Sequence, residues 1–398
     1  MRVNLLVSVV LLCTLPAVRP ASAAAGWAVD LGTPAAGSTN VVTDGGVRLG
    51  PGDNRAASAG SDLRTGFAEY PHRLATPANA FRAVVRGDVP AGTELAVDVR
   101  GRAGGQWTEW AEIRPDRPGV LPETVTDIEA RATLSAPAGA RSPTLTALSV
   151  VPATMPAAVP DRPARTATAG LSYPVFATRE GLVGRTTANG HRIVARDHFV
   201  ALPSRRGLSA RDSGVYSVRV CAGNGRCAWA PVWDVGPWNT RDDYWAPPGV
   251  RQEWRDLPRG KPESQAAYQG GYNGGRDQFG RRVTNPAGID LADGTFWDGL
   301  RLNGNAWVTV TYQWTGTSPA GYVDTPGDTL NVRSAPNSRS AIVGLAGHRA
   351  QVRIECAAAG EPVSGTQGTT DGWYRLAARM YVSAAYVAGG RTAPACRR

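Results

Sequence analysis

Glycine and proline recur along the whole chain, and this feature constrains the fold more than any other. The 398-residue sequence holds 47 Gly and 30 Pro without the three-residue period of collagen. Turn residues at this frequency leave little room for long helices, so they predict β-rich domains. With 42% hydrophobic residues the chain can build buried cores, which excludes a wholly disordered protein. Its length allows about two to four domains.

The chain is basic, with a formal net charge of +10. The positive residues are scattered rather than clustered, and Lys261 is the only lysine among them. Binding to nucleic acid usually needs a concentrated basic patch, so we expect no nucleic-acid partner. A diffuse positive charge instead favours an acidic surface such as a bacterial cell wall.

Residues 1–25 have the organisation of a signal peptide. Arg2 gives a short positive region, residues 4–18 are mostly apolar, and small residues at 21–23 form a cleavage site. No later apolar run is long enough to span a membrane. We therefore expect a secreted monomer that is not held by the membrane after cleavage. A lipid anchor at Cys13 is the alternative, and Leu12 before it is larger than such an anchor requires.

Four cysteines remain in the exported chain, an even number that suits an oxidising compartment. Cys221 and Cys227 bracket an Asn-Gly turn, which predicts a disulfide across a hairpin and leaves Cys356 and Cys396 as the second pair. Two cysteines with five residues between them and no neighbouring histidine are poorly spaced for zinc. We predict no metal and no cofactor.

The pattern of strands and turns predicts a mostly β protein with several domains. Strand-like alternation at 94–100, 128–134 and 145–151 indicates an N-terminal β-sandwich over residues 26–151. A Pro/Ala-rich linker over 152–170 separates it from a middle domain at 171–315 and a C-terminal domain at 320–398. Short helices are expected at 262–268 and 294–300. Trp107 and Trp110 are interpreted either as a sugar-stacking surface or as packing residues.

Three polar residues of the middle domain are the candidates for chemistry. Asp234 lies at a strand end among tryptophans, where lost hydration favours the protonated form that a glycosidic acid needs. Asp290 and His198 are the other two candidates. Each also has a structural interpretation: Asp234 as a turn cap, Asp290 as a helix cap, and His198 as a buried histidine.

Aromatic residues surround Asp234 and continue into the long segment 239–287. Because aromatic faces stack on sugar rings, this segment either walls a glycan cleft or simply packs over the domain. A Gly-rich stretch at 270–275 lacks the Lys-Ser/Thr of a phosphate loop, which excludes a nucleotide site of that type. The candidate substrate-binding residues here are Trp238, Trp233, Tyr244, Trp245 and Tyr272.

Four motifs in order give the middle domain a family resemblance. Gly-Arg-Thr-Thr-Ala-Asn-Gly at 184–190, the run 198–203, Asp-x-Gly-Pro at 234–237 and Ile-Asp-Leu at 289–291 resemble the double-psi β-barrel of rare lipoprotein A and the expansins. The resemblance implies that Asp234 and His198 act as a functional pair, as in lytic transglycosylases of this type. It implies a wall-loosening role for Asp290. The long insert before residue 289 departs from the family pattern.

The C-terminal domain resembles the bacterial SH3-like domain. The run Leu-Asn-Val-Arg-Ser-Ala-Pro at 330–336 and Gly-Trp-Tyr at 372–374 carry this resemblance. Such domains bind peptidoglycan peptides or wall glycans, so the resemblance implies the same type of partner here. Trp373 and Tyr381 are the candidate groove residues, and both also suit a core position.

These observations together predict a secreted, wall-associated protein whose partner is a cell-wall glycan, most simply peptidoglycan. Non-catalytic binding or expansin-like loosening is the favoured function. The alternative is lytic or hydrolytic cleavage of glycan strands by Asp234 with His198, where hydrolysis would use Asp290 as the second carboxylate. Secreted inhibitors, toxins and scaffolds are the remaining classes.

Overall fold

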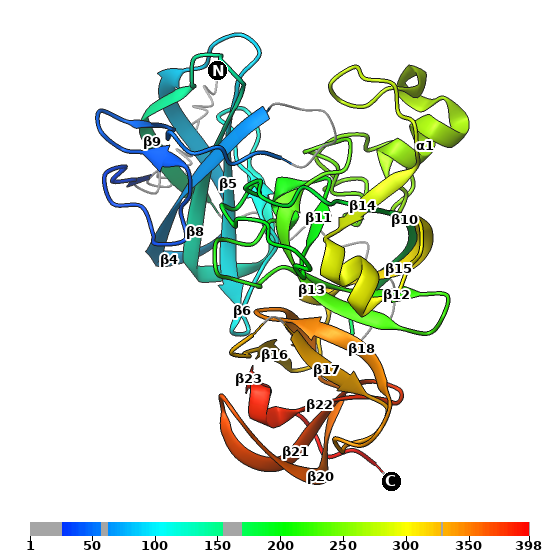
Figure 1. Ribbon diagram of the computed structural model, residues 1–398. Coiled ribbons are helices and arrows are strands. Elements are labelled where there is room, and N and C mark those ends of the chain that lie inside the picture. The colour runs from blue at the N-terminus through cyan, green and yellow to red at the C-terminus, as the bar shows by residue number, and fades with distance from the viewer. Residues whose placement is uncertain (1–25, 57–62, 154–168, 328, 398) are drawn as a thin grey trace, which may run out of the picture.

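The computed structural model describes residues 26–56, 63–153, 169–327 and 329–397, so the predicted signal peptide and most of the predicted linker lie outside the described residues. The described chain is mostly β, as predicted, with 48% of residues in strands and 8% in helices. Figure 1 shows an N-terminal sheet beside a central barrel, with the C-terminal strands below both. Among the described residues, no helix is both long and apolar enough to cross a membrane.

The N-terminal part is one continuous sheet with the strand order β2-β3-β9-β4-β8-β5-β6. The first half of the long strand β4 pairs with β8, and its second half pairs with β9. The predicted strands at 94–100, 128–134 and 145–151 lie inside β5, β8 and β9. The strands are β1 (Trp27–Ala28), β2 (Val41–Val42), β3 (Val47–Leu49), β4 (Leu63–Asp88), β5 (Glu94–Ala103), β6 (Gln106–Trp107), β7 (Ala111–Glu112), β8 (Gly119–Pro137) and β9 (Thr144–Ala153).

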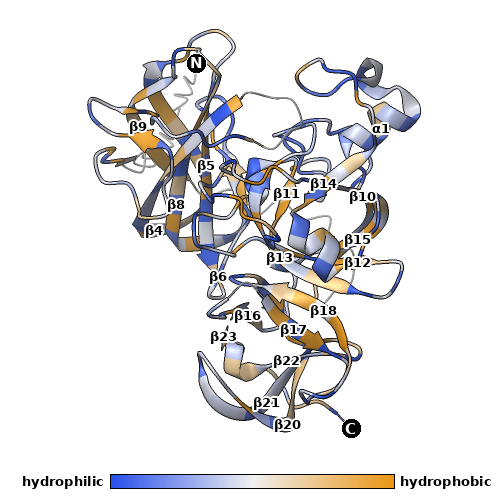
Figure 2. Cartoon of the chain, viewed as in Figure 1, coloured by the Kyte–Doolittle hydropathy of each residue, from blue (hydrophilic) through white to orange (hydrophobic). Residues whose placement is uncertain are grey.

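Six strands of the middle region close into a barrel in the order β11-β14-β10-β15-β12-β13, with β13 pairing back to β11. Two of the pairs, β10 with β14 and β11 with β13, are parallel. Alternating valine side chains of β12 and β15 fill the interior, and Figure 2 shows the apolar residues concentrated in such strands. The strands are β10 (Leu171–Arg179), β11 (Val200–Leu202), β12 (Ser217–Ala222), β13 (Cys227–Val235), β14 (Ala287–Leu291) and β15 (Ala306–Tyr312).

Helical segments are short, as expected from the glycine and proline content. The two predicted helices correspond to α1 and to the turn η3. Helix α1 ends at Gly271, whose left-handed φ of 65° suits a residue without a side chain. The helical segments are α1 (Glu263–Gly270), η1 (Arg205–Gly207), η2 (Tyr272–Gly275), η3 (Thr295–Gly299), η4 (Gln313–Thr315) and η5 (Ala384–Tyr386).

The C-terminal strands continue the barrel sheet, because β18 pairs in parallel with β13. Trp229 of β13 belongs to the C-terminal core rather than to the barrel interior. The pairing of β18 with β13 therefore joins the C-terminal strands directly to the barrel. The strands are β16 (Ala320–Val323), β17 (Thr329–Arg333), β18 (Ile342–Gly347), β19 (Gln351–Arg353), β20 (Cys356–Gly365), β21 (Gly368–Ala377), β22 (Met380–Ser383) and β23 (Val387–Gly389).

Both predicted disulfides are confirmed. Cys221 and Cys227 are register partners on β12 and β13, so their bridge closes the hairpin. Cys356 and Cys396 join the start of β20 to the end of the chain. The second bridge closes a much longer loop and therefore removes more freedom from the unfolded chain.

The N-terminal sheet packs directly on the barrel. Trp110 is buried within the barrel core, and the guanidinium groups of Arg100 and Arg131 lie 4.4 and 4.2 Å from its ring centre. Arg131 is ion-paired with Glu69 and also donates to the Leu208 carbonyl of the barrel. Of the two interpretations of Trp110, the structure therefore shows packing.

Candidate functional site

Asp234 and Asp290 lie in one row of the barrel sheet. Asp234 on β13 and Asp290 on β14 are each the register partner of Ala201 on the strand between them. Thr178 on β10 is the partner of Asp290 and extends the row by one strand. Residues directly opposite each other point to the same face of a sheet, and the small Ala201 side chain leaves space between the two carboxyl groups. We call these four residues the acid row.

Asp234 is almost completely buried, with 2% of its surface exposed. Its Oδ1 atom accepts hydrogen bonds from the backbone N–H groups of Ala188, at 2.9 Å, and Val235, at 2.7 Å. Such bonds hold the side chain in one orientation and tie the 184–190 loop to the end of β13. This arrangement matches the turn-capping interpretation of Asp234.

Asp290 is also buried, with 6% exposure, and Thr178 donates a hydrogen bond to its Oδ1 atom. Burial raises the pKa of Asp290 to about 7, and the Thr178 hydrogen bond opposes that rise. Asp290 lies on a strand that pairs on both sides. The helix-cap interpretation therefore does not describe its hydrogen bonding.

Glu180 is a third carboxyl at this site, and the sequence analysis missed it. It follows the last residue of β10 and donates its backbone N–H to the Leu291 carbonyl at 2.9 Å. Burial raises the pKa of Glu180 well above its usual range, and the charges of Asp234 and Asp290 raise it further. No N–H or hydroxyl donor among the described residues reaches its two buried oxygens.

Asp234 and Asp290 are the two nearby carboxyls whose charges, after burial, raise the pKa of Glu180 most. Strand alternation places Glu180 two residues after Thr178, on the face that carries Asp290. The position of Glu180 on the same face as Asp290 can be inferred only when the register of β10 with β14 is known.

The histidines of this region make different contacts. His198 is buried, and its ring lies so close to Gly294 that a side-chain carbon there would be 2.6 Å from Nε2. His191 is more open, and its Nε2 atom lies 2.6 Å from Oδ2 of Asp197. The His191 ring packs at 4.6 Å on Trp233, the residue before Asp234. A histidine–carboxylate pair therefore packs against Trp233, and it is formed by His191 and Asp197.

The N-terminal sheet covers this end of the barrel. Phe67 of β4 packs in one buried cluster with Ala188 and Val235, the two residues whose N–H groups bind Asp234. Gly190 has a φ of 91°, and a side-chain carbon there would lie 2.3 Å from the Thr39 hydroxyl. Residues 187–189 of this loop are thus buried under the N-terminal sheet, whereas residues 184 and 185 are exposed to solvent.

Most of the predicted aromatic binding residues are buried and use their polar atoms internally. Trp233 donates to the Ser213 carbonyl at 2.8 Å, and the Tyr244 hydroxyl donates to the Gly288 carbonyl at 3.0 Å. At this burial the rings act as core side chains in the described conformation. The same holds for Trp238, Trp245 and Trp373. Tyr272 and Tyr381 are only half-buried, and for them a binding role stays a prediction.

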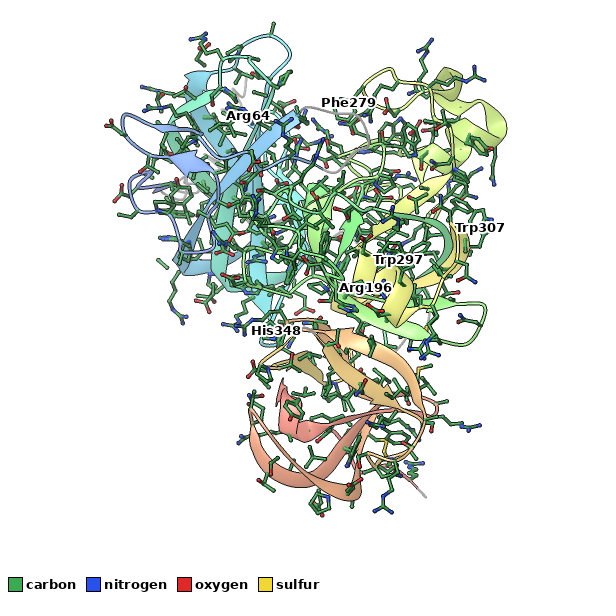
Figure 3. The ribbon with its side chains drawn as sticks, viewed as in Figure 1. Arg64, Arg196, Phe279, Trp297, Trp307 and His348 are labelled. Atoms are coloured by element: carbon green, nitrogen blue, oxygen red, sulfur yellow. A yellow bond between two sulfur atoms is a disulfide. The ribbon has the colours of Figure 1, made fainter. Side chains whose placement is uncertain are left out.

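Two tryptophans that the sequence analysis did not select are open on the barrel. Trp297 in η3 is 38% exposed, and Trp307 in β15 is 45% exposed. Figure 3 labels both on the side of the barrel away from the N-terminal sheet. Arg196 and Arg179 lie over the Trp297 ring, whereas the Trp307 ring packs edge-on against Phe176.

A groove of about 340 Å³ opens in the C-terminal part. Arg333 of β17 and Tyr386 of η5 contribute its largest polar groups. Short hydroxyl and amide side chains line the remainder together with the apolar residues Pro326, Leu330, Val363 and Trp373. Trp373 forms part of the wall and donates its indole N–H to the Glu361 carbonyl at 2.9 Å. Trp373, one of the two predicted groove residues, therefore lines the groove. Tyr386 also lines it, and we did not predict this residue from the sequence.

Residues 171–311 match the model of a family described as a domain of unknown function (DUF8814). The matched range runs from the first barrel strand into the last one and includes the 239–287 segment. The comparisons with curated proteins and with solved structures gave no match. Within the described ranges, no group of three or more His, Cys, Asp or Glu side chains is placed to hold a metal ion.

Proposed function

We propose that this is a secreted, wall-associated protein that binds peptidoglycan without cleaving it. The observation that carries the proposal is the closure of the acid row. Asp234 and Asp290 are 2% and 6% exposed, and Phe67 packs over the residues that bind Asp234. An acid that cleaves a glycosidic bond must reach the linking oxygen, and a carboxyl sealed under a second domain does not reach it.

The finer fold assignments support this proposal. The two parallel pairs, β10 with β14 and β11 with β13, are compatible with a double-psi barrel, and the bent sheet before it is compatible with a β-sandwich. The C-terminal strands are compatible with an SH3-like fold. Both disulfides suit an oxidising compartment, which supports secretion.

The C-terminal groove is the binding site that we propose for peptidoglycan. Arg333 supplies a positive charge, and its only side-chain hydrogen bond among the described residues runs from Nη1 to the Ser340 carbonyl at 2.9 Å. Most of its donor hydrogens therefore remain for a ligand. Peptidoglycan stem peptides end in carboxylates, which a guanidinium group binds well. The net charge of +10 adds a long-range attraction to the acidic wall.

Co-sedimentation with purified peptidoglycan tests this site. Arg333→Gln removes the groove charge and should lower the bound fraction, with an affinity loss of about tenfold. Arg379→Gln is the matched control, because Arg379 is exposed in the same domain and lies outside the groove lining. Equal losses in both variants would show a nonspecific charge effect, and no binding by the unaltered protein would refute the proposal.

One observation favours the alternative of glycan cleavage. Burial and the nearby carboxyls of Asp234 and Asp290 raise the pKa of Glu180, which favours the protonated form that a general acid requires. Lytic or hydrolytic chemistry would need the N-terminal sheet to move away from the 184–190 loop. Release of soluble glycan fragments from peptidoglycan would decide for this alternative.

A further inference from the structure

A separate pocket of about 520 Å³ lies in the 239–287 segment, whose role the sequence left open. Its lining includes Arg241, Glu253, Trp254, Arg276, Asp277 and Gln278. In Figure 3, Phe279 of the same loop is labelled near the edge where this segment approaches the N-terminal sheet. Figure 1 places helix α1 of this segment at the opposite end of the molecule from the C-terminal strands.

The loop that forms one wall of the pocket is held in place by a buried carboxylate. Asp277 accepts hydrogen bonds from the backbone N–H groups of Phe279 and Arg281, both at 2.9 Å. Its second oxygen accepts from Nε of Arg281 at 2.6 Å. Asp277 is therefore fully used inside the protein, and its role is to fix the loop before any ligand arrives.

The Gln278 side chain is also held in one orientation, but its amide can still form further hydrogen bonds. Its Oε1 atom accepts from the Thr240 N–H at 2.7 Å, and its Nε2 atom donates to the Thr240 hydroxyl at 2.8 Å. A side-chain amide has two donor hydrogens and two acceptor sites, so one of each remains. An oriented donor and acceptor side by side is the arrangement that recognises a sugar hydroxyl.

The pocket lining holds two arginines and two carboxylates, and Arg276 is the one of these four without an ion-pair partner among the described residues. Arg241 is balanced by the carboxylates of Glu94 and Glu253, at 3.0 and 3.2 Å. Arg276 donates one hydrogen bond to the Gly280 carbonyl, and no ion pair of Arg276 occurs among the described residues. Because a guanidinium group has five donor hydrogens, most of those on Arg276 remain for an anion.

We propose that this pocket binds a sugar that carries a carboxylate. The half-buried Trp254 ring packs on the sugar ring, Gln278 binds a hydroxyl, and Arg276 binds the carboxylate. A neutral sugar leaves Arg276 unused, and a small inorganic anion leaves Trp254 unused. The pocket is distinct from the C-terminal groove, and its residues make no contribution to the proposed binding by Arg333.

Calorimetric titration of the full chain tests this assignment with two matched pairs of sugars. Glucuronic acid is compared with glucose, and N-acetylmuramic acid with N-acetylglucosamine, because the two members of each pair differ in a carboxylate-bearing group. We expect each acid to bind about tenfold more tightly than its neutral partner, as for a charge-assisted hydrogen bond. A preference confined to one acid identifies which of the two sources of the carboxylate fits.

Arg276→Gln should abolish the preference for the acids, and Arg282→Gln should retain it. Arg282 is exposed, and its backbone forms an isolated β-bridge with that of Arg276. Because Arg282 lies outside the pocket lining, its substitution controls for the loss of one positive charge. Trp254→Leu should weaken the acids and the neutral sugars alike. Any of three results would overturn the proposal. These are equal binding of acid and neutral sugar in both pairs, a preference for the acids that survives Arg276→Gln, and no binding of any sugar. Loss of peptidoglycan binding in Arg333→Gln with this preference intact would show that the two sites are separate.

Discussion

Thr178 donates its hydroxyl hydrogen bond to Asp290, its register partner on the neighbouring parallel strand. This bond is made inside the barrel sheet, where Asp290 has little contact with water. The bond favours the charged form of Asp290, yet burial outweighs it and raises the pKa to about 7. The pKa values of Asp290 and Glu180 are therefore both raised, which has a direct consequence for stability.

We expect the protein to be more stable at about pH 5 than at about pH 8. The folded state holds the Asp290 proton more tightly than the unfolded chain, whose aspartates ionise near pH 4. This stabilisation is complete below about pH 4 and is lost as the pH rises through about 7. Glu180 acts in the same direction because its pKa is also raised. Chemical denaturation across this pH range measures the effect.

Asp290→Asn should flatten this pH dependence, because asparagine keeps the Thr178 hydrogen bond and has no proton to lose. Asp212→Asn is the control, since Asp212 is well exposed and its left-handed backbone also suits asparagine. An unchanged slope in Asp290→Asn would contradict the assigned pKa.

The Arg131–Glu69 pair should be important for the attachment of the N-terminal sheet to the barrel. Arg131 is 1% exposed and also donates to the Leu208 carbonyl. Arg131→Met leaves the Glu69 charge buried without a partner, so we expect a loss of about 3–5 kcal/mol in the free energy of unfolding. Arg73→Met breaks an exposed pair with Asp127 and should cost about 0.5 kcal/mol or less. Similar losses in both variants would argue against a tightly packed interface.

The two disulfides should differ in their contribution to stability. Cys356 and Cys396 are 40 residues apart, whereas Cys221 and Cys227 are 6 apart. Chain entropy predicts losses of about 4 kcal/mol and about 2 kcal/mol when each pair is replaced by serine. Denaturation of the two double variants measures both values, and the reverse order would contradict an origin in the unfolded chain.

Trp307 should contribute to contact with wall polymer. Its ring is among the most exposed large side chains of the barrel, and sugar rings pack on such surfaces. Trp307→Ala is expected to weaken adsorption to peptidoglycan about fivefold, or roughly 1 kcal/mol. Tyr268→Ala removes an exposed ring from α1 and should leave adsorption unchanged. Equal effects of the two substitutions would assign the loss to general surface hydrophobicity.

Local signals in the sequence were sufficient for several features of this fold. The Asn-Gly turn between Cys221 and Cys227 predicted both the hairpin and its disulfide, because turn chemistry and cysteine spacing act over a few residues. The position of Asp234 at a strand end was also predictable, and the structure places Asp290 in the same row.

Contacts between distant segments were not predictable in this way. The burial of Trp110 depends on how the N-terminal sheet packs on the barrel, and nothing near Trp110 in the sequence encodes that packing. Glu180 was missed because its importance follows from the pairing of β10 with β14. Tyr386 lines the C-terminal groove through the short turn η5, which carries no strong local pattern.

The central claim is that the protein binds peptidoglycan while its acid row stays closed. The most direct test is chromatography of the soluble products after prolonged incubation of the full chain with purified peptidoglycan. We predict that the protein sediments with the polymer and releases no glycan fragments, and that Asp234→Asn behaves identically. Fragments that appear with the unaltered protein and disappear with Asp234→Asn would contradict this account and establish an enzyme.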